Sequence, residues 1–176
     1  MRMRAAVRIF VVIMIIICIS GCKGADGKVA DPLAYRGAGF SAEVHGKFNG
    51  VEFAALISAD AGEGDARRMR VEYTSPQSVS GVYIEQSGGA VTVGCGELSL
   101  PGDDMAAMLA PCRMLLPGDD VCILSVTAEK QDGVDVTVIA LSDGGRVVLD
   151  SACEFPKCVF REKDELYIDW FEPLRG

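Results

Sequence analysis

Hydrophobic and polar residues alternate along several short stretches of this chain, and the first stretch is the most regular. From Phe40 to Phe48 every second residue is apolar or small, and the residues between them are polar or charged. A period of two predicts a strand with one buried face. Asn49-Gly50 favours a type I′ hairpin turn, and the apolar positions from Val51 to Ile57 predict the return strand. The other face of that strand, with Ala54 and Leu56, is also apolar, which predicts cover on both sides.

Other segments rich in β-branched and aromatic residues are bounded by turn-forming residues, and each predicts a further strand. They are residues 69–73, 81–85, 90–94, 97–100, 121–128, 134–141, 146–150, 159–161 and 166–171. This pattern is typical of a meander of about ten short antiparallel strands, because no parallel βαβ pattern interrupts it.

Helical spacing occurs in one segment. Its apolar positions, three or four residues apart, are Met105, Met108, Cys112 and Leu115. The spacing predicts a short helix, with Asp103 or Asp104 as its N-cap and with Pro111 breaking or ending it.

A mostly antiparallel sheet has to bury its apolar face. The sequence therefore predicts a mainly β fold with one or two short helices, in which a curved antiparallel sheet or half-barrel has a helical cover. A closed β-barrel or a β-sandwich is the alternative.

The N-terminus holds a different kind of apolar run. Residues 9–19 are apolar, follow three arginines and no acidic residue, and lead into small residues. A bilayer-spanning helix takes about 20 apolar residues, so a cleaved secretory signal is predicted. Ile19-Ser20-Gly21-Cys22 resembles the lipobox of bacterial lipoproteins. The resemblance implies that Cys22 is acylated, becomes the new N-terminus and anchors the protein to a bacterial membrane outside the cytoplasm. The alternative is an ordinary signal with an incidental cysteine.

This prediction divides the chain into three parts. They are a signal peptide (residues 1–21), a lipidated N-terminus and Gly-rich tether (22–34), and a single β-rich domain (35–176). Residues 31–36 are alternatively one helical turn. Loss of residues 1–21 removes three of the 17 basic residues and none of the 25 acidic ones, so the net charge changes from −8 to −11. This charge does not favour nucleic acid or electrostatic docking on anionic lipid.

Five of the seven cysteines remain in the predicted domain. An odd number allows at most two disulfides beside a free thiol, or simply buried thiols. The predicted disulfide joins Cys153 and Cys158, because a hairpin closing at Phe155-Pro156 would place the two side chains opposite each other.

The order of elements resembles that of the LolA/LolB/LppX-like lipoprotein-carrier superfamily. The matching features are the exported lipoprotein context, the hairpin at Asn49-Gly50, the strand that ends at Thr74-Ser75-Pro76, and the cover formed by residues 105–116. The family usually has a helix before the first strand, and residues 31–39 are short for one. The resemblance implies an open, curved sheet whose concave side helices cover.

No motif for catalysis or cofactor binding occurs in the sequence. The single histidine, His45, falls on the polar face of a predicted strand, and Gly-x-Ser-x-Gly, Walker A and dinucleotide motifs are absent. The carboxylate pairs Asp103-Asp104 and Asp119-Asp120 adjoin Pro-Gly turns, where acidic residues cap helices and hold turns. We predict no catalytic residue, no metal site and no cofactor, and we expect a protein that is not an enzyme.

Two functions are compatible with these features. The first is a membrane-anchored protein that binds or carries an apolar or amphipathic ligand, such as a lipid or acyl chain, in the concave face of the sheet. The residues predicted to line that site are Met105, Met108, Leu109 and Leu115, because methionine-rich surfaces adapt to ligands of variable shape. The second is an envelope protein–protein interaction module with a filled core and no ligand. The sequence names no protein partner.

Overall fold

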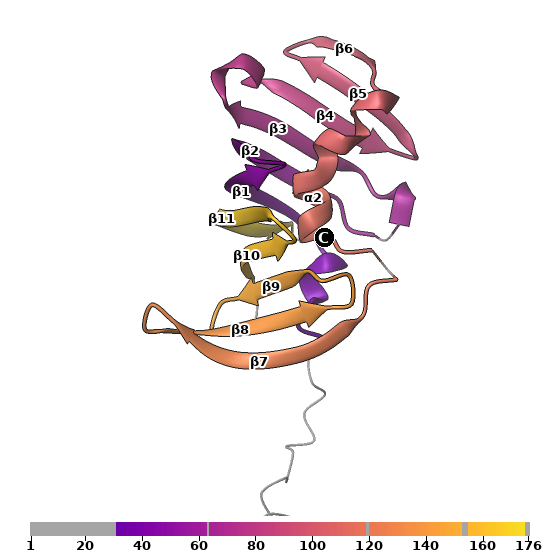
Figure 1. Cartoon of the computed structure of the whole chain (residues 1–176). Coiled ribbons are helices and arrows are strands. Elements are labelled where there is room, and N and C mark those ends of the chain that lie inside the picture. The colour runs from indigo at the N-terminus through magenta and orange to yellow at the C-terminus, as the bar shows by residue number, and fades with distance from the viewer. Residues whose placement is uncertain (1–30, 63, 119, 153–154, 175–176) are drawn as a thin grey trace, which may run out of the picture. The chain divides into compact units, whose positions relative to one another are not determined.

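The computed structural model describes residues 31–62, 64–118, 120–152 and 155–174. Pro32–Gly176 forms one compact unit. Within the described residues, eleven strands form one sheet in the order β6-β5-β4-β3-β2-β1-β11-β10-β9-β8-β7. All neighbouring strands are antiparallel. Figure 1 shows the sheet curving, with α2 on its concave side.

The strands follow the alternating segments closely. They are β1 (Gly39–Phe48), β2 (Val51–Ala59), β3 (Met69–Ser75), β4 (Val82–Ser87), β5 (Ala90–Cys95), β6 (Leu98–Pro101), β7 (Ile123–Gln131), β8 (Val134–Leu141), β9 (Arg146–Leu149), β10 (Pro156–Arg161) and β11 (Asp164–Leu174). Asn49 and Gly50 have φ values of 50° and 84°, which confirms the predicted hairpin turn. The predicted curved antiparallel sheet is confirmed. The alternatives of a closed barrel or a sandwich are wrong, because β6 and β7 lie at opposite edges of an open sheet.

Helices are short and mostly of the 3₁₀ type. They are η1 (Ala34–Arg36), η2 (Gly64–Ala66), η3 (Gln77–Val79), η4 (Asp103–Leu109) and α2 (Ala110–Leu115). The predicted helical segment is confirmed, and Pro111 divides it by lying in the first turn of α2, where its missing N–H is tolerated. The predicted acidic N-cap is wrong, because Gly102 precedes η4 and no side chain caps it. None of the helices in the described part of the chain is long and apolar enough to cross a bilayer.

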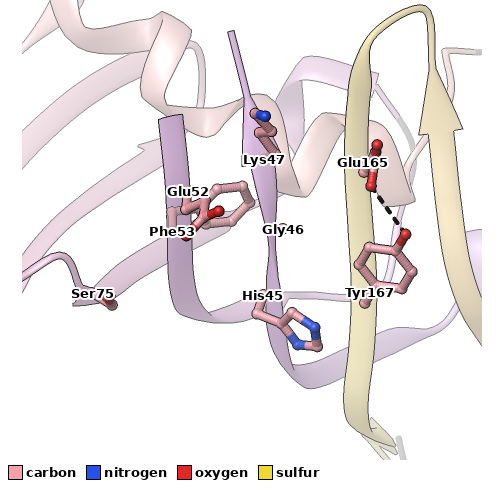
Figure 2. Close-up of a pocket in the computed structure, with 8 residues that line it drawn as sticks. All are labelled: His45, Gly46, Lys47, Glu52, Phe53, Ser75, Glu165 and Tyr167. Atoms are coloured by element: carbon pink, nitrogen blue, oxygen red, sulfur yellow. Dashed lines mark hydrogen bonds between the residues drawn. The ribbon is translucent and has the colours of Figure 1, made fainter. Parts of the chain in front are cut away.

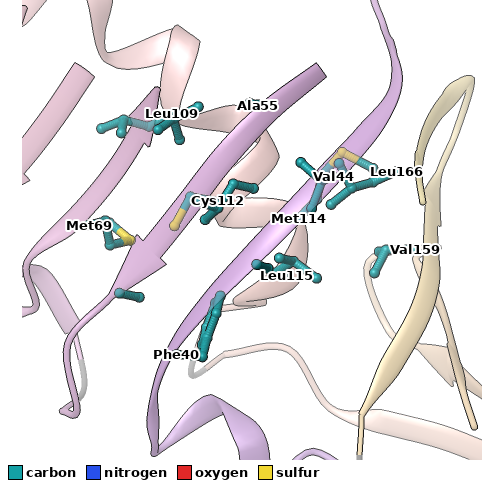
Figure 3. Packing of buried hydrophobic residues seen from close by; sticks show 14 of the residues in the cluster. Phe40, Val44, Ala55, Met69, Leu109, Cys112, Met114, Leu115, Val159 and Leu166 are labelled. Carbon is teal, nitrogen blue, oxygen red and sulfur yellow. The ribbon is translucent and has the colours of Figure 1, made fainter. Parts of the chain in front are cut away.

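The main core lies between the concave face of the sheet and the η4–α2 segment. Figure 3 shows Met114 of α2 next to Val44 of β1 and Leu166 of β11, and all three belong to this core. η1 confirms the alternative of a helical turn at residues 31–36, and Leu33 and Tyr35 around it are buried in this core. The packed unit therefore takes in residues that precede the predicted domain boundary at residue 35.

Two expectations from the sequence differ from the structure: the cover on both faces of β2 and the position of the hairpin between β9 and β10. Leu56 is 46% exposed, so β2 is covered on its concave face only. The hairpin between β9 and β10 does not close at Phe155-Pro156, because Pro156 already belongs to β10 and pairs with Leu149. A smaller apolar cluster on the convex face joins β8, β9 and β10.

Candidate functional site

The predicted ligand-binding segment lies across the concave face. η4 packs on β3, β4 and β5, and α2 packs on β2, β3 and β10. Of the four predicted lining residues, Leu109 and Leu115 are completely buried, Met108 is half-buried against the core, and Met105 is 39% exposed. The structure therefore brings Leu109 and Leu115 into the core, packs Met108 partly buried against it, and leaves Met105 exposed.

Two tyrosines attach this cover to the rest of the domain. The Tyr73 hydroxyl of β3 donates to the carbonyl oxygen of Met108 at 2.7 Å. The Tyr35 hydroxyl of η1 donates to the carbonyl oxygen of Leu115 at 3.0 Å. Burial raises the pKa of Tyr73 to about 12, so this phenol remains a donor across the physiological range. Backbone carbonyls near the end of each helical piece thus receive a partner, from β3 for η4 and from η1 for α2.

Cys112 is the most deeply buried group of the cover that can titrate. Burial raises the pKa of its thiol to about 12, and the nearby cations Arg67 and Arg113 oppose this only in part. A thiol in that state is not a nucleophile. Cys112 therefore contributes apolar packing to the site and no chemistry.

Arg67 closes one side of the core. It is only 7% exposed, and its guanidinium donates to the carbonyl oxygens of Arg36 and Ala38. It also faces the ring of Phe40, with its Cζ atom 5.9 Å from the ring centroid. Burial lowers its pKa, and nearby Cys112 and Asp60 oppose this. These contacts attach the chain before β1 to the turn before β3.

A shallow pocket lies where β1, β2 and β11 meet. Its volume is about 470 Å³, and its lining includes His45, Lys47, Glu52, Ser75 and Glu165. Figure 2 shows the ring of His45 next to that of Tyr167, and their centroids are 5.3 Å apart in a stacked arrangement. The Tyr167 hydroxyl donates to Glu165 Oε2 at 3.0 Å, and this contact raises the tyrosine pKa.

The same pocket holds a histidine and a serine, but they are not placed as the base and nucleophile of a hydrolase. His45 Nδ1 and Asp169 Oδ2 share a hydrogen bond of 2.7 Å, so the histidine is paired rather than simply solvated. Ser75 lies two strands away, because His45 pairs with Ala54 and Ala54 pairs with Ser75. Neighbouring strands are about 4.8 Å apart, so the serine hydroxyl is too far from the imidazole to be activated by it. The pocket can bind polar groups, but it does not form a nucleophile–base pair.

A β-bulge beside this pocket exposes a residue that sequence reasoning missed. Val44 pairs with Ile168 and Glu43 pairs with Trp170, so Asp169 has no partner in β1. The extra residue shifts the alternation of β11, and the Trp170 side chain lies on the convex face with 47% of its surface exposed. The core-facing residues Leu166, Ile168 and Phe171 are two and then three positions apart, and this departure from a period of two was the signal in the sequence.

Two of the predicted groups fall outside the part of the chain that the structure describes. They are Cys22 and Cys153, so lipidation and the disulfide stay predictions. Cys158 lies on the convex face of β10, packed in the smaller apolar cluster, and burial raises the pKa of its thiol. Among the residues that the structure describes, no group of three or more His, Cys, Asp or Glu side chains is arranged to hold a metal ion.

The comparisons with known proteins add information on the fold. No family model and no curated protein matches the sequence. Among solved structures, MucB superposes with a TM-score of 0.50 at 18% identity, over 83% of this chain and 57% of MucB. MucB in complex with MucA(peri) matches with a TM-score of 0.46 at 16% identity, over 83% of this chain and 54% of that chain.

Two further proteins match over most of their length. An uncharacterized conserved protein from Thermus thermophilus has a TM-score of 0.49 at 15% identity, with coverage of 83% and 85%. A LolA superfamily protein from Nitrosomonas europaea has a TM-score of 0.41 at 11% identity, with coverage of 84% and 90%. At such identities the likeness to MucB concerns the fold alone. This chain therefore shares with part of MucB an open, curved sheet with a helical cover.

Proposed function

We propose that this protein is an extracytoplasmic lipoprotein, anchored to a bacterial membrane through Cys22, that binds an apolar or amphipathic ligand without catalysis. The ligand, a lipid or acyl chain, would lie between the concave face of the sheet and the η4–α2 cover. One observation carries the proposal: the apolar concave face is covered by a short, proline-divided segment that two tyrosine hydrogen bonds attach to the domain. The LolA-like order of elements and the fold shared with MucB support it.

The cover has to move for a ligand to enter, because its own side chains fill the interface. Burial of one leucine is worth about 1.5–3 kcal/mol, and burial of one methylene about 0.8 kcal/mol. Lifting Leu109 and Leu115 off the sheet therefore costs about 3–6 kcal/mol, and an acyl chain of about eight methylenes offsets this. The exposed Met105 and the half-buried Met108 would then contact the part of the ligand nearest the solvent. The affinity should rise with chain length, and short-chain acids should not bind.

Native mass spectrometry of residues 23–176, which lack the acylation site, tests this proposal directly. We expect co-purified lipid, or uptake of a long-chain fatty acid added to the protein. A ligand-free mass without uptake of a fluorescent fatty acid would contradict it. The variant Met108→Asp should lose the ligand and keep its circular dichroism spectrum. The matched control Leu98→Asp, on the exposed strand β6, should keep both.

A protein–protein interaction module is the second candidate, and one observation favours it. Leu109, Cys112 and Leu115 have no exposed surface, so the interface beneath the cover is filled by the protein itself. In that case Met108→Asp would destabilise the domain, and neither the unchanged protein nor the variant would contain an apolar ligand. The mass measurement and the thermal stability of the variant together separate the two functions.

A further inference from the structure

Four residues on the convex face of β3 and β4 form a compact cation-binding arrangement. The guanidinium carbon of Arg70 lies 3.7 Å from the ring centroid of Tyr83. Its Nη2 is 2.9 Å from Glu72 Oε2, and its Nη1 is 3.7 Å from Glu85 Oε2. In the register of the sheet, Glu72 pairs with Tyr83 and Arg70 pairs with Glu85. The face of an aromatic ring and two carboxylates therefore surround one guanidinium, an arrangement that suits its planar charge.

The same arrangement recurs on β1 and β11 without the arginine. Glu43 pairs with Trp170, and Ser41 pairs with Glu172, on the same convex face of the sheet. Trp170 thus corresponds to the tyrosine, Glu43 and Glu172 to the two glutamates, and Ser41 to Arg70. No cation of the described residues lies over the Trp170 ring, and neither of the two carboxylates forms an ion pair within that part of the chain.

The exposure of Trp170 is built into the strand. Without the bulge at Asp169, the alternation that buries Leu166 would direct position 170 toward the core. The bulged residue is held by its hydrogen bond to His45, which lies on the neighbouring strand. Exposing a large aromatic side chain forgoes part of the free energy of its burial. β-bulges re-aim side chains and are over-represented next to functional sites.

We propose that Ser41, Glu43, Trp170 and Glu172 bind an arginine side chain of a partner polypeptide. The guanidinium would stack on Trp170 and contact the two carboxylates, as Arg70 does in its own site. Leu56, which pairs with Glu43 from the other side, adds an exposed apolar contact for the next part of the partner. This surface lies on the face of the sheet opposite the η4–α2 cover, so the inference does not depend on the proposed apolar ligand.

Trp170 makes the proposal measurable, because it is the only tryptophan of the chain. The full-length protein in a neutral detergent is titrated with a dodecapeptide of alternating arginine and serine, followed by tryptophan fluorescence and calorimetry. We expect saturable binding that changes the emission and weakens as salt is added. The matching lysine–serine peptide should bind more weakly, and the glutamate–serine peptide should not bind. Equal binding of the acidic peptide would overturn the proposal.

Two variants assign the binding to these residues. Glu43→Gln combined with Glu172→Gln should weaken the affinity about fivefold, and the control Glu97→Gln with Asp132→Asn, which removes the same charge elsewhere, should leave it unchanged. Ser41→Arg should place an arginine of the chain over Trp170. It should change the emission without peptide and weaken peptide binding at least about fivefold.

The outcomes also separate this site from other interactions. An equal loss of affinity in the control variant would show unspecific attraction to an acidic protein and would overturn the proposal. Dimerisation of the protein as its concentration rises is another outcome. If Glu43→Gln abolishes that dimer, the surface binds a second copy of this chain and not a different polypeptide. Met108→Asp should leave arginine-peptide binding intact, so a failure of the apolar-ligand proposal and a failure of this one give different results.

Discussion

Gly46 shows how closely β1 and β11 approach each other. A Cβ atom at this position would collide with the backbone carbonyl oxygen of Glu165. Because backbone cannot move aside as a flexible side chain does, Gly46→Ala should lower the free energy of unfolding by about 2 kcal/mol or more. Urea denaturation measures this. Gly37→Ala is the matched control, since the nearest atom to its new Cβ would be 3.8 Å away, and its stability should change by no more than about 0.5 kcal/mol.

The buried thiol of Cys112 predicts alkaline sensitivity. Its pKa rises from 9.0 to about 12 in the folded protein because burial disfavours the thiolate. Folding therefore favours the protonated form, and this contribution is complete below pH 9 and lost as the pH rises from 9 to 12. The free energy of unfolding should fall over that range, and less steeply in Cys112→Ala. The control Cys122→Ala removes an exposed thiol, and a pH dependence identical in all three proteins would contradict the assignment.

Thiol labelling gives an independent view of the same residue. Cys95 and Cys122 are exposed, whereas Cys112 is completely buried. At pH 8 an alkylating reagent should modify the two exposed cysteines in the native protein and should reach Cys112 only after unfolding.

The cover depends on contacts with other elements more than on its own helix. η4 and α2 are too short to be stable alone, and Tyr35 and Tyr73 each donate one hydrogen bond to their backbone. Changing either tyrosine to phenylalanine should cost about 1–2 kcal/mol and should speed amide hydrogen exchange in residues 103–116. Tyr83→Phe, on the convex face, is the control. Faster exchange throughout the sheet in Tyr73→Phe would show that the cover does not open independently.

At the scale of the whole molecule, the first and last strands of the sheet, in sequence order, stabilise each other. β1 and β11 are neighbours in the centre of the sheet, so neither half of the sheet is complete without the other. We expect one cooperative unfolding transition, in which Trp170 fluorescence and the circular dichroism of the sheet change together. A chain ending at Arg161, without β11, should not fold. Separate transitions for the two signals, or a folded truncated chain, would show that the halves are independent.

Local chemistry was sufficient to predict most elements. A period of two with a buried face forces an extended strand, and Asn49-Gly50 tolerates the positive φ values that a tight hairpin needs. The helical spacing around Met108 and the division at Pro111 followed from the same local rules. These features depend on residues close together in the sequence.

Long-range pairing decided what local rules could not. The register between β1 and β11 joins residues more than a hundred positions apart, and only this register shows that Asp169 is bulged, that His45 contacts it and that Trp170 points outward. The hairpin predicted at Phe155-Pro156 failed for the same reason, since its position depends on the pairing of β10 with β9.

By itself the sequence determined the strands, the main turns and the cover segment, because each rests on a local pattern. Export and acylation at Cys22 stay predictions. The tertiary structure alone decided that Leu109 and Leu115 are buried while Met105 is exposed, and that Ser41, Glu43, Trp170 and Glu172 form one surface. The physical reason is that strand pairing and side-chain packing bring together residues that are far apart in the sequence. No local pattern of residues predicts such contacts.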